Sequence, residues 1–256
     1  MRIVTLANHK GGVGKTTTSL CLAAGLSDKK YKVLLIDLDP QSNLSYSCGY
    51  KADEYQGRTL YDVLHRTADI NDCILNVFGA KDFDLLIGGL ALIRAESDPK
   101  ITDTSLNDVL LNLDKEYDFI VIDTPPSMGK LTLQAISISD DLIVPIEPSI
   151  FALNGLGNLI GFAEDTNRNI NLEGLLLVGV NERTNIGKEF LEQYNKTAKN
   201  LGTKLFKACI HNSVQVPESQ YNQKSLFDQA PKATVTKDYQ AFVDEYVKGA
   251  KKHGIR

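Results

Sequence analysis

Tryptophan is absent from this 256-residue sequence, and methionine and cysteine are scarce, with two and four residues. The cysteines, Cys21, Cys48, Cys73 and Cys209, are far apart and include no Cys-x-x-Cys pair. This spacing argues against a disulfide framework or a zinc site and is typical of a reducing compartment. The sequence has no run of about 18 apolar residues and no charged, apolar leader, so we expect a cytoplasmic protein that spans no membrane.

The formal net charge is only −4, which does not by itself indicate a nucleic-acid partner. The charge is unevenly distributed, however. Residues 183–256 hold 13 basic and 7 acidic side chains, whereas residues 1–182 hold 15 basic and 25 acidic ones. The C-terminal third is therefore a basic face on an acidic body, and either a solvated lysine surface or a binding face explains the excess.

Short apolar runs alternate with helix-like stretches along the whole chain. The predicted strands are residues 3–7, 32–39, 83–87, 119–124, 142–147, 175–180 and 205–210. The predicted helices are residues 15–28, 59–66, 105–114, 129–139, 152–168, 187–200 and 236–249. Most of the strands do not alternate apolar with polar residues, so both faces of the sheet should be buried. We expect one α/β domain over residues 1–256, with a doubly wound, mostly parallel sheet, helices on both faces, and no N-terminal DNA-binding domain.

Two polar segments are predicted to be long loops, residues 40–58 and 211–235, and loops of this length are more often functional than idle. The last predicted helix has one apolar face. Its residues are Tyr239, Phe242, Val243, Tyr246, Val247 and Ala250. A membrane-binding helix is one interpretation, but two tyrosines and basic residues confined to its end favour packing on the core.

The stretch "GGVGKTT", residues 11–17, follows a predicted strand and opens a predicted helix. Backbone N–H groups of Gly11, Gly12, Val13 and Gly14 can converge on phosphate oxygens, where the helix N-terminus adds favourable charge. In the usual pattern Lys15 reaches the β- and γ-phosphates and Thr16 holds Mg²⁺. That pattern also has a glycine where this sequence has His9, and here a further lysine, Lys10, precedes the glycines.

Two acidic segments support a phosphate site. "VIDTPPS" carries Asp123 at a predicted strand end, where a carboxylate holds the Mg²⁺ shell. "LLIDLDPQ" ends another strand with Asp37 and Asp39. We expect Asp39 to orient the attacking water and Asp37 to support the turn.

The segments "KGGVGKTT", "LLIDLDPQSN", "YDFIVIDTPPS", "LTLQAISISDDLIVPIEPSIFALNGL" and "ERTN" resemble those of the ParA/Soj partition ATPases. These enzymes belong to the P-loop NTPases with a deviant Walker A motif, a group that includes MinD. The resemblance runs from about residue 3 to about residue 190, continues more weakly to the end, and is with the small type that lacks an N-terminal DNA-binding domain.

The resemblance implies an ATP-dependent homodimer in which two subunits sandwich two ATP molecules. Lys10 would then reach the partner's phosphates, as an arginine finger does. It further assigns Lys15, Thr16 and Thr17 to phosphates and Mg²⁺, Asp39 to the hydrolytic water and Asp123 to the Mg²⁺ shell, through a water. Pro40, Gln41 and residues 124–126 match the segments that sense the γ-phosphate. Asn181 is where relatives contact adenine.

The family also implies non-specific binding of double-stranded DNA by the ATP dimer, and slow hydrolysis stimulated by a ParB-like protein. Arg183 matches a family arginine implicated in DNA binding. Relatives carry further arginines after the last core strand, where this chain reads "HNSVQVPESQ". The contacts must then come from other residues, and the candidates are Lys188, Lys224, Lys232, Lys237, Lys248, Lys251 and Lys252. We interpret His211 and His253 as structural or solvated.

Other functions remain open at this point. A MinD-like positioning ATPase needs a lipid-binding C-terminal helix, for which "EYVKGAKKHGIR" is poorly suited. An ATP-dependent ligase needs a second substrate pocket. A reductase like the nitrogenase iron protein needs cysteines beside "DTPPSMGK", which has none. A DNA-coating structural protein would differ from a partition ATPase chiefly in its hydrolysis rate.

Overall fold

A computed structural model describes residues 1–149, 155–181 and 185–252, apart from the side chains of residues 185–190 and 252. Within these residues, eight strands form one sheet in the order β3-β4-β2-β5-β1-β6-β7-β8. The strands are β1 (Arg2–Leu6), β2 (Val33–Asp37), β3 (Ile74–Asn76), β4 (Phe83–Leu86), β5 (Phe119–Asp123), β6 (Asp141–Ile146), β7 (Asn171–Val180) and β8 (Leu205–His211). Neighbouring strands are parallel except β3 and β4.

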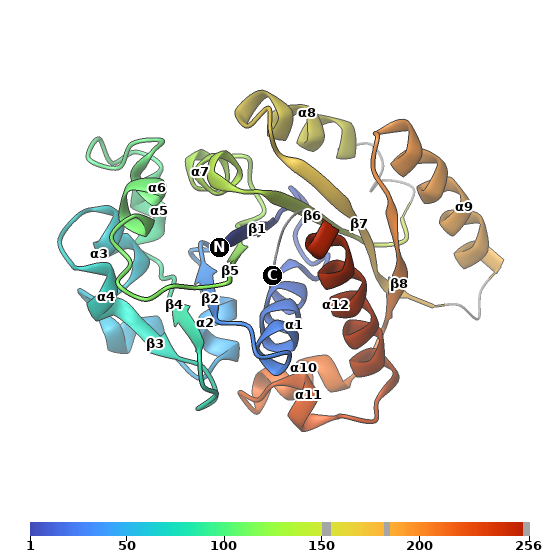
Figure 1. Ribbon diagram of the computed structural model, residues 1–256, viewed down its shortest axis with the longest axis horizontal. Coiled ribbons are helices and arrows are strands. Elements are labelled where there is room, and N and C mark those ends of the chain that lie inside the picture. Colours follow the sequence, from blue (N-terminus) through green and yellow to red (C-terminus); the bar gives the residue numbers. More distant parts are fainter. Residues whose placement is uncertain (150–154, 182–184, 253–256) are drawn as a thin grey trace.

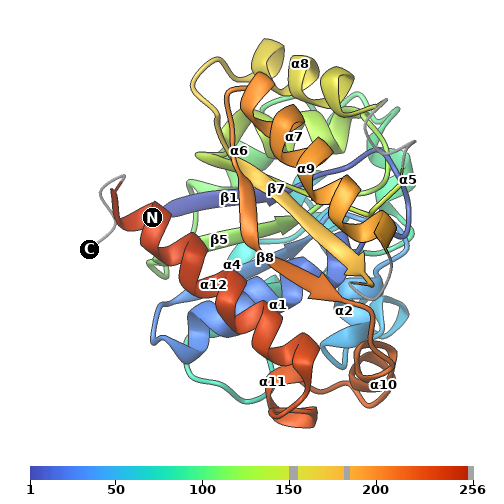
Figure 2. The ribbon, with the colours of Figure 1, turned by 90° about the vertical axis from the view of Figure 1, so that its right-hand side faces the viewer.

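Helices cover both faces of this sheet (Figures 1 and 2). The longer ones are α1 (Lys15–Asp28), α7 (Lys130–Ile138), α8 (Leu156–Thr166), α9 (Asn185–Asn200) and α12 (Thr234–Lys252). The shorter ones are α2 (Asn43–Ser47), η1 (Ala52–Tyr55, a 3₁₀-helix), α3 (Leu60–Leu64), α4 (Ile70–Cys73), α5 (Leu92–Ala95), α6 (Ser105–Leu110), α10 (Gln215–Tyr221) and α11 (Leu226–Gln229). The predicted doubly wound α/β fold is confirmed.

The central strands are buried on both faces, as their unbroken apolar runs predict. Val4 and Leu35 point into a cluster with α1 and α12, whereas Ile3, Leu34 and Ile36 point into a cluster with α3, α6 and α7. Successive residues of a strand face opposite sides of a sheet, so a strand covered by helices on both sides must be apolar throughout. Figure 2 shows the resulting layers, with α8 and α9 on one side of the sheet and α1 and α12 on the other.

The apolar face of α12 packs on the core, as predicted. Tyr239, Phe242 and Tyr246 are at most 1% exposed. The Tyr246 hydroxyl donates a hydrogen bond of 2.9 Å to a carboxylate oxygen of Asp141, which also accepts from the buried Arg2 guanidinium. The tyrosines are thus satisfied inside the protein, and a membrane is not needed to cover this face.

The two segments predicted as long loops are more ordered than their composition suggested. Residues 40–58 contain α2 and η1, and residues 211–235 contain α10 and α11. The antiparallel edge strand β3 was not predicted, because three residues are too few to show a periodicity. No helix among the described residues has both the length and the apolar character needed to cross a membrane.

Candidate functional site

The loop between β1 and α1 lies at the edge of the sheet where the parallel strands end, which is where ligands bind in this class of fold (Figure 1). Gly12 and Gly14 have φ angles of 78° and 82°, which favour glycine. A Cβ atom on Gly14 would lie 2.8 Å from Cγ1 of Val178. In contrast, no atom lies within 4 Å of the place where a Cβ on Gly11 or Gly12 would be. The loop is therefore tightly packed against Val178 at Gly14 and has open space beside Gly11 and Gly12.

Lys15 begins α1 and is 6% exposed. Its Nζ atom donates a hydrogen bond of 3.1 Å to the carbonyl oxygen of Lys10. Burial lowers the pKa of the Lys15 ammonium, and Asp123 and Asp39 act in the opposite direction. A buried cation at a helix N-terminus, facing an open loop, is suited to receive an anion.

Asp123 ends β5 and is fully buried. Its carboxylate accepts a 2.7 Å hydrogen bond from Thr16 Oγ1 and a 3.0 Å hydrogen bond from Ser19 Oγ. Burial, together with the nearby Asp37, raises the pKa of Asp123 to about 8. The contact with Thr16 brings together the two residues predicted to hold Mg²⁺. Sequence reasoning missed Ser19, although it lies on the Thr16 face of α1, three residues later.

The two aspartates after β2 lie in different surroundings. Asp37 is fully buried and accepts hydrogen bonds from the Ser45 backbone N–H (2.9 Å), the Ser45 hydroxyl (2.6 Å) and the Asp39 N–H (3.1 Å). Burial raises the pKa of Asp37 to about 6. Asp39 is 9% exposed and accepts from the Gln41 N–H at 2.9 Å. Asp37 thus supports the turn, while Asp39 is the carboxylate closer to solvent.

Lys10 lies outside the cradle that surrounds Lys15. Its ammonium pairs with Glu147, the residue after β6, and both side chains are more than a third exposed. The Lys10 backbone N–H donates to the side-chain oxygen of Asn8 at 3.0 Å, and the Asn8 amide donates to the Pro145 carbonyl at 2.7 Å. These bonds join the loop to the end of β6. Sequence reasoning missed both Asn8 and Glu147.

A cavity of about 560 Å³ adjoins the phosphate loop. It is lined by Gly12, Val13, Gly14, Thr17, Glu147, Pro148, Val178, Gly179, Ile210, His211, Asn212, Ser213, Val216, Pro217 and Tyr239. Asn181 is exposed and is not among these residues, so its contact with a base stays a prediction. The segment after β8 supplies much of the cavity wall. In the sequence, the length of this segment, predicted as a long loop, was the one indication that it contributes to the site. His211 is held by Asp238, 2.8 Å from its Nδ1 atom.

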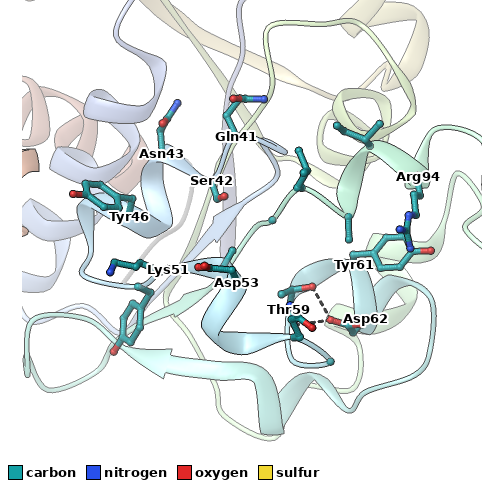
Figure 3. A pocket seen from close by; sticks show the side chains of 18 residues that line it. Gln41, Ser42, Asn43, Tyr46, Lys51, Asp53, Thr59, Tyr61, Asp62 and Arg94 are labelled. Atoms are coloured by element: carbon teal, nitrogen blue, oxygen red, sulfur yellow. Dashed lines mark hydrogen bonds between the residues drawn. The ribbon is translucent and has the colours of Figure 1, made fainter.

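A larger cavity, of about 980 Å³, lies between residues 41–62 and 89–94 (Figure 3). Tyr46, Leu90 and Ile93 line it and are 44–67% exposed. Gln41 forms part of its wall. Just beyond α5, the Glu96 carboxylate accepts a 2.8 Å hydrogen bond from the first N–H of α7. This cavity therefore adjoins one of the two segments predicted to sense the γ-phosphate, the one that contains Gln41.

The candidate DNA contacts fall into two groups. Lys224, Lys232 and Lys237 are exposed and lie around α10, α11 and the start of α12; we call these three residues the basic end. Figure 2 shows α10 and α11 beside the first turns of α12. Lys248 and Lys251 are exposed near the other end of α12, about 20 Å from Lys237 at the rise of a helix. Arg183 and His253, and the side chains of Lys188 and Lys252, lie outside the described residues.

These residues fit a nucleotide with Mg²⁺. The glycine loop leaves open space, Lys15 supplies a buried cation, and Thr16 with Asp123 supplies oxygen atoms of the kind Mg²⁺ prefers. The adjoining cavity gives room for a base and ribose beside the loop. Both parts lie on the same edge of the sheet.

Comparisons with known proteins agree with this geometry. A family of AAA domains matches residues 1–173. The sporulation initiation inhibitor protein Soj of Bacillus subtilis (strain 168) is 34% identical over 240 residues, which cover 91% of this chain and 92% of Soj. A plasmid partition protein of Borrelia burgdorferi B31, solved with bound AMPPNP, has a TM-score of 0.83 and 27% identity, over 97% of this chain and 99% of that one. Cobyrinic acid a,c-diamide synthase of Mycobacterium smegmatis, solved with ADP and magnesium, also has a TM-score of 0.83, with 26% identity over 100% and 97%.

Proposed function

The chain belongs to the ParA/Soj family of partition ATPases, and from this premise we propose that it is an ATP-driven switch that binds non-specific DNA as a dimer. ATP would assemble the dimer, the dimer would bind DNA, and hydrolysis would release it. The observation that carries the proposal is the pair of lysines. Lys15 is buried within the phosphate loop, whereas Lys10 is partly exposed outside it.

Within one subunit, the loop N–H groups and Lys15 would bind the phosphates, and the Thr17 hydroxyl would contact them from the first turn of α1. Thr16 and Asp123 would hold Mg²⁺, Asp123 through a water molecule. Mg²⁺, when bound, supplies positive charge to the phosphates and the departing ADP. The 2.7 Å contact between Thr16 and Asp123 supports their shared role.

Between subunits, Lys10 would leave Glu147 and bind the partner's phosphates. Two anionic nucleotide sites that face one another repel, so a cation from each subunit makes dimerisation depend on ATP. The exposure of the Lys10–Glu147 pair supports this exchange, because solvent-exposed ion pairs contribute little stability and are readily broken.

Hydrolysis would depend on Asp39, which would orient the attacking water and accept its proton. Its position at the edge of the site, with Asp37 holding the turn behind it, supports this division of roles. Pro40, Gln41 and residues 124–126 would move when the γ-phosphate leaves. A ParB-like DNA-binding protein would accelerate this step in the cytoplasm, where the ATP dimer would be found on the nucleoid.

The basic end is the preferred DNA surface among the candidates. Its lysines are carried by the segment whose first residues line the 560 Å³ cavity, so a change in the nucleotide can reach them. Lys248 and Lys251 lie about 20 Å further along α12 and have no such connection.

Light scattering and phosphate release test the switch. The wild-type protein should be a dimer with ATP and a monomer with ADP. Lys10→Ala should remain a monomer with ATP, and Asp39→Ala should stay a dimer and release little phosphate. A wild-type protein that neither dimerises with ATP nor hydrolyses it would overturn the proposal.

A ligase is the second candidate, favoured by the likeness to the diamide synthase and by the 980 Å³ cavity beside Gln41. That cavity could receive a second substrate next to the γ-phosphate. Incubation with ATP, glutamine and cobyrinic acid, followed by mass spectrometry, distinguishes the two functions. An amidated product would support the ligase function. Cobyrinic acid recovered unchanged would argue against it and favour the ATP-driven switch.

A MinD-like function is tested separately, by sedimentation with anionic liposomes. Pelleting that requires ATP would support membrane positioning, and protein that remains in the supernatant with every nucleotide would exclude it.

A further inference from the structure

The short helix α10 connects the phosphate loop to the basic end. Val216 and Pro217, in its first half, line the 560 Å³ cavity. Gln220, in its last turn, donates a hydrogen bond of 3.1 Å from Nε2 to Oγ1 of Thr17. These residues are about 200 positions apart in the sequence, and the bond is partly buried. The helix α10 thus contacts the candidate nucleotide site in two ways. It forms part of the cavity wall, and it is hydrogen-bonded to Thr17 in the first turn of α1.

In this hydrogen bond the Thr17 hydroxyl oxygen is the acceptor, so its own proton is not used. A hydroxyl has one proton to donate and two lone pairs that accept. Because Gln220 occupies one lone pair, the Thr17 proton remains available to a phosphate oxygen. Hydrogen bonds in series polarise one another, so a bound phosphate would strengthen the bond from Gln220.

The remainder of α10 is weakly held. Ser219 is the buried residue of this helix, Val216 is partly buried against the core, and the helices that α10 packs on are α2 and α11. Val214, just before the helix, and Tyr221, in its last turn, are 69% and 80% exposed. A seven-residue helix with one fully buried residue can shift locally at a lower free-energy cost than a helix buried along its length. Its bond to Thr17 is therefore one of the contacts that fix its position, and the one that links it to α1 at the nucleotide site.

The basic end follows directly from this helix. Gln223 has a φ angle of 52°, and the Lys224 N–H donates to the Ser219 carbonyl at 3.0 Å, which closes a tight turn. The chain then enters α11, whose cap is Ser225. Lys232 follows α11, which ends at Gln229. A displacement of α10 must move Lys224 with it.

We propose that Gln220 is a positioning residue that couples nucleotide binding to DNA binding, through its hydrogen bond with Thr17. The inference rests on the proposed function. With a nucleotide bound, the Gln220–Thr17 bond fixes α10 and holds the basic end in one arrangement along the phosphates of a duplex. Without a nucleotide the bond is weaker, α10 is less fixed, and the lysines are not held together. The coupling is reciprocal, so DNA must also tighten nucleotide binding.

The test compares wild-type protein with Gln220→Ala and with a matched control, Gln215→Ala. Gln215 lies in the same helix, but its amide donates to Glu218 rather than to the loop. Dissociation constants for a random-sequence duplex are measured by fluorescence anisotropy, without nucleotide and with saturating non-hydrolysable ATP analogue. The affinity for the analogue is then measured with and without DNA. Circular dichroism and light scattering check the folding and dimerisation of each variant.

In the wild-type protein and in Gln215→Ala, the analogue should increase DNA affinity by the same factor. In Gln220→Ala that factor should fall by about fivefold or more, and the gain in analogue affinity caused by DNA should fall equally. DNA binding without nucleotide should be unchanged. Gln220→Glu should also weaken analogue binding, because a carboxylate accepts the Thr17 proton and repels phosphate.

Equal factors in wild-type and Gln220→Ala protein, within twofold, would overturn the coupling role while leaving the ATP-dependent switch intact. A wild-type protein that shows no effect of the analogue on DNA binding would instead contradict the proposed function, and the coupling role with it. A Gln220→Ala protein that no longer dimerises would show that the residue supports the nucleotide site generally, which also contradicts the coupling role.

Discussion

Lys10 and Glu147 form the ion pair that ATP must break if Lys10 acts across a dimer. In Glu147→Gln the lysine has no counter-ion, and the carboxylate that lines the cavity no longer repels phosphate. Exposed pairs contribute up to about 1 kcal/mol, so half-maximal dimerisation should need up to about fivefold less ATP. An ATP titration followed by light scattering measures this, with the exposed Glu164→Gln as control. An unchanged or higher ATP requirement would contradict the exchange of partners.

The buried carboxyl of Asp37 makes the stability of the nucleotide-free protein depend on pH. Its folded pKa is about 6, above the usual value near 4, so between these values the folded chain binds more protons than the unfolded chain. The free energy of unfolding contributed by this group therefore falls as pH rises from about 4 to about 6, by roughly 3 kcal/mol in all.

Asp37→Asn removes this titration, although the amide cannot accept all three of the hydrogen bonds. The stability advantage of wild-type protein over the variant should shrink as pH rises through that window. Urea unfolding at several pH values measures it, and the exposed Asp165→Asn should show no such trend. An advantage that is constant or grows with pH would show that folding does not raise the pKa of Asp37.

Among single residues of the candidate site, those that belong to a local motif can be predicted from the sequence. Those whose partners are brought close only by the fold cannot. Lys10, Lys15 and Thr16 lie within one short glycine-rich stretch, residues 10–17, and are recognisable from spacing alone. Glu147 is 137 residues from Lys10, and Ser19 is 104 residues from Asp123. No spacing rule connects such pairs, because the order of strands in the sheet decides which strand ends meet.

The packing of α1 on α12 depends on the absence of a side chain at Gly25. A Cβ atom there would lie 2.7 Å from Cγ2 of Val243. Overpacking costs about 1–3 kcal/mol, while alanine in place of glycine stabilises a helix by about 1 kcal/mol. Gly25→Ala should therefore destabilise the protein by about 1 kcal/mol.

In a Val243→Ala background, the same Gly25→Ala change should become stabilising, because the obstructing methyl groups are gone. Thermal unfolding of the four proteins gives the coupling energy, expected at about 2 kcal/mol. If Gly25→Ala changed the stability in the same direction in both backgrounds, α1 and α12 would not be in contact at Gly25 and Val243.

Among elements, long buried strands and long helices were predictable, and short helices in polar segments were not. The apolar run at 119–124 and the striped helix at 236–249 lie where β5 and α12 are found. The helices α2, α10 and α11 have four to seven residues, fewer than a periodicity needs. They form because they pack on one another and on α1, which is a tertiary effect.

For the molecule as a whole, the basic end should account for more of the DNA affinity than the far end of α12. Replacing Lys224, Lys232 and Lys237 by alanine should weaken ATP-dependent DNA binding and reduce the slope of log K against log salt, by about 0.9 for each DNA phosphate that is no longer neutralised. Lys248→Ala with Lys251→Ala is the matched control and should change the slope little. Equal effects on affinity in the two variants would place DNA along the entire length of α12.

The proposed switch depends on ATP-dependent binding of DNA without sequence preference. The most direct measurement is the binding of wild-type protein to random duplex DNA over a salt series, with ATP, with ADP and without nucleotide. Binding only with ATP, retained by Asp39→Ala, abolished in Lys10→Ala and weakening steeply with salt, is the result expected. DNA binding that is absent in every state, or equal in all three, would contradict it.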